Sequence, residues 1–245
     1  MAGHSKWANI KHRKAASDSK RGKIFTKIIR ELTIAARGGV ADPNSNPRLR
    51  TAIIKAKEAN MPKDTMERAI KKGSGELGGA AYEEFIYEGY GPGGVAIYME
   101  IMTDNKNRTA GDVRSLLAKM GGNLGANGCV DYMFDKKGTI LFNKSDVSEE
   151  AVMETGIEAG ADDIIVEGED IEVVTTTESF EKVLQAFEEK GFKHVSAEVT
   201  MIPNIYQDVQ TDLIEKVLSL IDKLEDNDDI QNVWTNLRLP DDYEV

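Results

Sequence analysis

The sequence lacks any long run of apolar residues and contains a single cysteine, Cys129. A transmembrane helix needs about 20 consecutive apolar residues, so we expect no membrane span and no membrane partner. One cysteine excludes an internal disulfide and favours a reducing compartment, which we expect to be the cytoplasm. The basic start of the chain has no apolar stretch after it, which argues against a secretory signal.

Residue patterns typical of catalysis and metal binding are also scarce. The three histidines (His4, His12 and His194) are scattered, and none accompanies a nucleophile pattern. The sequence has no CxxC, and its acidic runs lack the glycine and spacing of an EF-hand. We therefore expect no enzymatic activity, no metal, no cofactor and no small-molecule substrate. The alternative is an enzyme, a metal-dependent nuclease built from paired carboxylates.

What the sequence does have is a strong division of charge. Residues 1–72 contain 18 Lys or Arg and 6 Asp or Glu, whereas residues 73–245 contain 13 and 36. The net charge of the whole chain is -11. Positive charge gathered in one part of an acidic chain indicates a module that binds a polyanion, joined to an acidic body. The simpler alternative is a solvated basic face on a helical domain.

The first 27 residues hold the candidate contacts to nucleic acid. Their lysines and arginines offer charge-assisted hydrogen bonds to phosphate, and the Trp and His among them can stack on bases. For Trp7 an anchor that docks the N-terminus onto the helices is an equal alternative. The candidate nucleic-acid-binding residues are Lys6, Trp7, Lys11, His12, Arg13, Lys14, Lys20, Arg21, Lys23 and Lys27.

Apolar periodicity predicts a basic bundle of three helices over residues 1–75. A stripe of apolar residues between Ile24 and Leu32 marks the first of these helices. In the third we expect Asp64 and Glu67 to form a capping box, with Gly73 as the glycine that follows the helix end. A glycine-rich linker then separates the bundle from the rest of the chain.

From residue 82 the apolar period changes from helical spacing to two, which predicts strands. We expect residues 82–134 and 204–245 to form a discontinuous α+β domain. Residues 135–203 have the order strand, helix, strand, strand, helix, strand, typical of the ferredoxin-like fold. The predicted fold class is therefore α+β and multidomain: a three-helix bundle, and an α+β domain with an inserted ferredoxin-like domain. The central strands predicted for the ferredoxin-like domain offer few aromatic residues, which argues against an RNA-recognition motif in residues 135–203.

Several long segments resemble the YebC/PmpR family. They include MAGHSKWANIKHRKAASDSKRGKIFTK, NPRLRTAIIKAKEANMPKDTMERAIKKG, YEGYGPGGVA, NRTAGDVRSLLAKMGGNLGANGCVDYMF and LEDNDDIQNVWTN. Leu117 and Cys129 stand where we expect Phe and Ser, and these are changes on the scale of packing. The resemblance implies the three-part architecture, no enzymatic activity, nucleic-acid binding and control of gene expression. That family includes bacterial regulators and a mitochondrial translational activator of cytochrome c oxidase.

The resemblance leaves the type of nucleic acid open. The family has long been described as DNA-binding transcriptional regulators, but some members look like ribosome-associated factors that ease synthesis of difficult sequences such as proline runs. We expect a DNA-binding transcriptional regulator. The alternative is a ribosome- or RNA-associated translation factor that eases stalled synthesis.

Replacing Lys11, Arg13 and Lys14 by Ala is expected to weaken binding to any nucleic acid roughly uniformly across sequences. Each phosphate that the variant no longer binds should flatten the plot of log binding constant against log salt by about 0.9 on duplex DNA. A salt titration of binding measures this slope. An unchanged slope would place the contact surface elsewhere on the protein.

Overall fold

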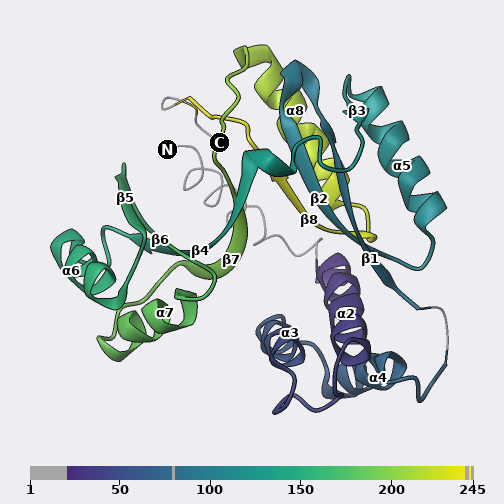
Figure 1. Ribbon diagram of the computed structural model, residues 1–245, viewed down its shortest axis with the longest axis horizontal. Helices are drawn as coiled ribbons and strands as arrows, with labels where there is room; N and C mark the ends of the chain where they lie inside the picture. The colour runs from purple at the N-terminus through teal and green to yellow at the C-terminus, as the bar shows by residue number, and fades with distance from the viewer. Residues whose placement is uncertain (1–20, 79–80, 241–242, 244–245) are drawn as a thin grey trace. The chain divides into compact units, whose positions relative to one another are not determined.

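The computed structural model describes residues 21–78, 81–240 and 243. This part of the chain is α+β: it holds seven α-helices and two sheets of four strands each (Figure 1). The described residues divide into two compact units. One contains residues 21–130 and 210–233, and the other contains residues 131–209 and 234–240. None of the described helices is both long and apolar enough to cross a membrane.

Three helices form the N-terminal bundle of the first unit: α2 (Arg21–Arg37), α3 (Pro47–Glu58) and α4 (Lys63–Gly73). Asn46 begins α3, because its side-chain oxygen accepts a hydrogen bond from the Leu49 amide at 3.0 Å. The bundle has its own apolar core, which contains Leu32, Ala35, Ala36, Leu49, Ala52, Ala56, Met61 and Ala69. The predicted helical part is therefore present.

Two details of α4 differ from expectation. Pro62 stands at the cap position and the cap makes no side-chain hydrogen bond, so the predicted capping box of Asp64 and Glu67 is wrong. Gly73 is the last residue of the helix, and Ser74 follows it. A Cβ at Gly73 would lie 2.2 Å from the Thr33 carbonyl oxygen. The glycine is required because α2 and α4 approach closely there, which a single-helix reading of the sequence does not reveal.

The first sheet has the strand order β3-β1-β2-β8. Its strands are β1 (Glu83–Tyr90), β2 (Ala96–Thr103), β3 (Asn123–Leu124) and β8 (Ile230–Thr235), accompanied by α5 (Lys106–Lys119) and α8 (Thr211–Glu225). Strands β1 and β2 pair antiparallel from Glu83–Thr103 to Tyr90–Ala96. Because β8 comes from the tail, the tail completes the sheet that the middle of the chain begins.

The second sheet has the strand order β5-β6-β4-β7. Its elements follow one another as β4 (Phe134–Asn143), α6 (Glu149–Ala159), β5 (Asp163–Glu167), β6 (Asp170–Thr175), α7 (Phe180–Glu189) and β7 (Ser196–Pro203). The two helices pack on one face of this sheet through a core that includes Phe142 and Phe187. The centroids of these two rings lie 4.8 Å apart.

Candidate nucleic-acid interface

Most of the predicted contact residues lie outside the described residues. These are Lys6, Trp7, Lys11, His12, Arg13, Lys14 and Lys20. Arg21 is the first residue of α2, and its side chain is not described. Lys23 and Lys27 lie on the first two turns of the same helix. The structure therefore locates two of the ten predicted side chains.

Both of those lysines have a partner in the acidic part of the same unit. The ammonium of Lys23 lies 2.7 Å from the Asp226 carboxylate, and the two side chains are 41% and 54% exposed. The ammonium of Lys27 donates to the Gln231 carbonyl oxygen at 3.5 Å. An exposed ion pair such as that of Lys23 and Asp226 contributes little to stability. Phosphate contacts by Lys23 and Lys27 stay a prediction, and such contacts would compete with these bonds.

Arg30, one helical turn after Lys27, is a buried cation. One nitrogen of its guanidinium, Nη1, donates to Oδ1 of Asp229 at 2.6 Å and to the Met102 carbonyl oxygen at 2.9 Å. The same nitrogen contacts the Asp228 carbonyl oxygen. Arg30 therefore joins α2 to the end of β2 and to the turn before β8.

Asp229 gathers further donors around its second oxygen, Oδ2. Thr109 Oγ1 donates to Oδ2 at 2.6 Å, Arg108 Nη2 at 2.9 Å and Thr103 Oγ1 at 3.2 Å. Burial alone would raise the pKa of Asp229. The hydrogen bonds from Thr109, Arg108 and Arg30, with the charge of Arg30, outweigh burial and lower the pKa below its ordinary value. The carboxylate is therefore ionised at neutral pH.

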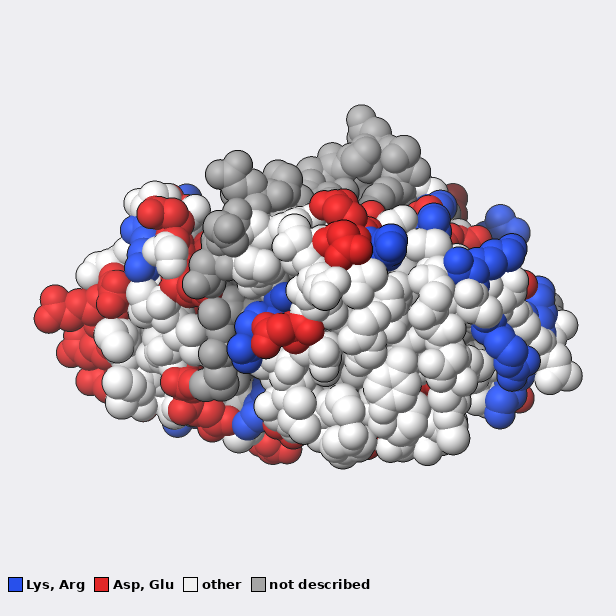
Figure 2. Space-filling view, turned by 90° about the horizontal axis from the view of Figure 1, so that it is seen from above, with Lys and Arg blue, Asp and Glu red and all other residues white. Residues whose placement is uncertain are grey.

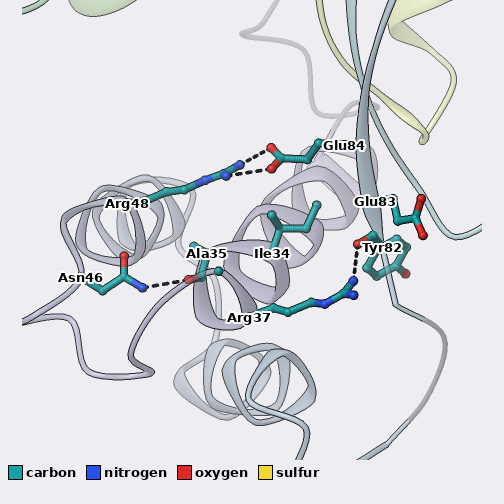
Figure 3. Close-up of a pocket in the computed structure, with 9 residues that line it drawn as sticks. Ile34, Ala35, Arg37, Asn46, Arg48, Tyr82, Glu83 and Glu84 are labelled. Carbon is teal, nitrogen blue, oxygen red and sulfur yellow. Dashed lines mark hydrogen bonds and ion pairs between the residues drawn. The ribbon is translucent and has the colours of Figure 1, made fainter.

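A cavity of about 530 Å³ lies between α2, the start of α3 and residues 82–84 (Figure 3). Arg48 enters it and binds two carboxylates, Glu31 at 2.8 Å and Glu84. Arg37 donates to the Tyr82 carbonyl oxygen at 2.9 Å. Both arginines thus bind groups of the protein itself, so this cavity is a poor site for a phosphate.

Other cations of the bundle point to solvent. Lys55 and Lys57 on α3 and Arg68 and Lys71 on α4 are exposed, and no ion pair joins them to an acidic side chain of the described residues. The sequence alone did not single out these residues, because the charge of residues 1–27 is denser. Their positions opposite the apolar face of each helix could have revealed them.

The described residues offer little for catalysis. Burial, followed by the nearby charge of Glu88, raises the pKa of Cys129, which disfavours the reactive thiolate. In residues 21–78, 81–240 and 243, no three His, Cys, Asp or Glu side chains gather as a metal-binding group. His4 and His12 lie outside these ranges.

Comparison with known proteins identifies relatives over almost the entire chain. The model of the TACO1/YebC protein N-terminal domain matches residues 5–76, and that of the TACO1/YebC second and third domain matches residues 82–237. This chain belongs to the TACO1/YebC family.

Individual relatives agree with this assignment. A probable transcriptional regulatory protein of Treponema denticola is 57% identical over 245 residues, which covers 100% of this chain and 99% of the relative. One of Geobacter sulfurreducens is 57% identical over 236 residues, covering 96% and 95%. The crystal structure of a conserved hypothetical protein from Aquifex aeolicus matches with a TM-score of 0.84 at 47% identity, covering 96% and 97%.

The Asp229→Asn variant is expected to lose about 3–5 kcal/mol of unfolding free energy, because it leaves two arginines facing a neutral amide. Since the folded-state pKa of Asp229 is lowered, its contribution is fully present above about pH 4 and is lost as pH falls through that lowered pKa. Denaturant unfolding at several pH values measures the difference.

Asp226→Asn is the matched control, because it removes an aspartate whose ion pair with Lys23 is exposed. This control should cost about 0–1 kcal/mol. Equal losses in the two variants, or a gap that widens toward acid pH, would contradict a buried role for Asp229.

Proposed function

We propose that this protein is a non-enzymatic regulator of gene expression that binds DNA and acts on transcription. The observation that carries the proposal is the concentration of 18 Lys or Arg against 6 acids in residues 1–72 of an acidic chain. The names of relatives at 53–57% identity support a regulatory role, since each is called a probable transcriptional regulatory protein.

The proposed contacts are of two kinds. Lysine and arginine side chains between Lys6 and Lys27 bind phosphates, while Trp7 and His12 stack on bases or sugars. The exposed cations of α3 and α4 extend the same interface, because Lys55 and Lys57 face solvent on the bundle. The acidic remainder repels phosphate and so favours approach of the DNA to the basic end.

A second candidate function is translation control through RNA or the ribosome. One observation favours it. The exposed face of α4 carries both acids and cations, namely Asp64, Glu67, Arg68 and Lys71. A helix with such a face is poorly suited to recognise base edges in the major groove of DNA, as a recognition helix does. A protein that recognises the shape and backbone of a folded RNA does not need a recognition helix of this kind.

We further propose the finer architecture and location. Residues 135–203 form an inserted ferredoxin-like domain, residues 82–134 with 204–245 form the domain that receives it, and residues 1–75 form the bundle. The strand order β5-β6-β4-β7 supports the insertion, because its central strands are the first and third of the segment. The single cysteine supports a cytoplasmic protein.

Two measurements on cells separate the candidates. We expect crosslinking to enrich promoter DNA with the full-length protein, and sucrose gradients of lysate to leave the protein in the top fractions. The Lys11→Ala/Arg13→Ala/Lys14→Ala variant should lose the promoter signal. A control with Lys136, Lys182 and Lys193 replaced by Ala removes the same charge from exposed positions of the acidic part and should keep it.

Movement with ribosomal particles that RNase abolishes would instead establish the translation role. Metal-dependent cleavage of a labelled strand by the purified protein would contradict the proposal that it is not an enzyme.

A further inference from the structure

The acidic part of the first unit contains one basic element. Residues 82–130 include four Lys or Arg, and all four lie on α5: Lys106, Arg108, Arg114 and Lys119. Six acids occur in the same stretch, but Asp112 alone of them lies on this helix. In Figure 2 the Lys and Arg side chains gather over α5, at the right of the view. Cations scattered at random over the segment would not concentrate on one helix.

Two of the four cations bind groups of the protein. Arg108 pairs with Asp104 and Asp229, each at 2.9 Å. The ammonium of Lys106 lies 4.3 Å from the centroid of the Phe85 ring. Arg114 and Lys119, in contrast, are exposed, and no ion pair joins either to an acid among the described residues.

A third exposed cation comes from another helix. The ammonium of Lys223, in the last turn of α8, donates to Sδ of Met120 at 3.4 Å, directly after the end of α5. Lys119 and Lys223 therefore lie at the same end of α5. Arg114 and Lys119 are five residues apart on α5, which at about 1.5 Å per residue is about 7.5 Å along the helix.

The surface between these cations carries only small side chains. Gly111, Ser115 and Ala118 are exposed on α5, and a Cβ at Gly111 would meet no atom within 4 Å. The glycine-rich turn after α5 continues this surface. A Cβ at Gly122 would lie 2.2 Å from the Tyr90 carbonyl oxygen, so the turn lies directly against the end of β1. An extended backbone can therefore approach without displacing large side chains.

The loop that follows β3, residues 125–130, is held in a fixed shape. The buried carboxylate of Glu88 accepts hydrogen bonds from the amides of Gly128 at 2.6 Å and Val130 at 2.8 Å. The Tyr90 hydroxyl donates to the Cys129 carbonyl oxygen at 2.9 Å. A surface that is ordered before it binds loses less conformational entropy on binding, which favours docking.

We propose that Arg114, Lys119 and Lys223 form a second docking surface, for the phosphate backbone of the duplex DNA that the basic N-terminal segment binds. The proposal rests on the proposed function and extends it, because the acidic body then also contacts the nucleic acid. Complementary charge identifies the occupant: three exposed cations border a surface of small residues. The contacts supply affinity and orientation without reading bases.

The test compares two full-length variants that each lose three positive charges. One carries Arg114→Gln, Lys119→Gln and Lys223→Gln. The matched control carries Lys136→Gln, Lys182→Gln and Lys193→Gln, which are exposed positions of the second unit. Fluorescence anisotropy with a labelled DNA duplex gives the binding constant over a range of salt concentrations. Thermal unfolding of each variant establishes that it is folded.

The variant that lacks Arg114, Lys119 and Lys223, called the α5 variant, should flatten the plot of log binding constant against log salt. We expect a change of about 0.9 for each phosphate that it no longer binds, and the control should keep the wild-type slope. Equal slopes in the wild type and the α5 variant would overturn the second surface and leave the proposed function standing. A slope change seen with RNA and not with DNA would overturn DNA as the occupant. A wild-type protein that binds neither would overturn the proposed function itself.

Discussion

The buried ion pair between Arg30 and Asp229 is the interaction on which the first unit depends. Arg30 comes from the helical bundle, and Asp229 lies in the turn that leads into β8. Hydrogen bonds from Thr109 and Arg108 to Asp229 bring in α5, and the Met102 carbonyl oxygen, which accepts from Arg30, brings in β2. A charge pair removed from water is tolerated when its hydrogen-bonding groups find partners, and loss of one partner is costly. This network therefore fixes the basic bundle against the sheet that the tail completes.

The cations of the bundle fall into two groups, those that bind the protein itself and those that face solvent. Arg30, Arg37 and Arg48 bind carboxylates and carbonyl oxygens of the protein, whereas Lys55 and Lys57 face solvent. Total positive charge therefore overstates the charge available to a partner. The same distinction applies to α5, where Arg108 binds Asp229 and Arg114 is exposed to solvent. Among these arginines and lysines of the bundle, we therefore propose Lys55 and Lys57 as nucleic-acid contacts and not Arg30, Arg37 or Arg48.

Local patterns in the sequence predicted much of the fold. The bundle, the change to strands near residue 82 and the coarse α+β class follow from apolar periodicity, because that signal is local. The partners of single side chains could not be predicted. Arg30 and Asp229 are 199 residues apart, and Gly73 is needed only because another helix passes within contact distance. Seven of the ten proposed contacts lie outside the described residues, so those assignments rest on the sequence alone.

The most direct test of this division of cations compares two double variants of the bundle with the same loss of charge. Lys55→Gln/Lys57→Gln removes solvent-facing cations, and Arg37→Gln/Arg48→Gln removes cations that bind the protein. Salt titration of nucleic-acid binding and the melting temperature are measured for both. The account predicts a flatter salt slope and an unchanged melting temperature for the first, and the reverse for the second. Equal flattening in both variants would contradict it, because binding would then follow total charge.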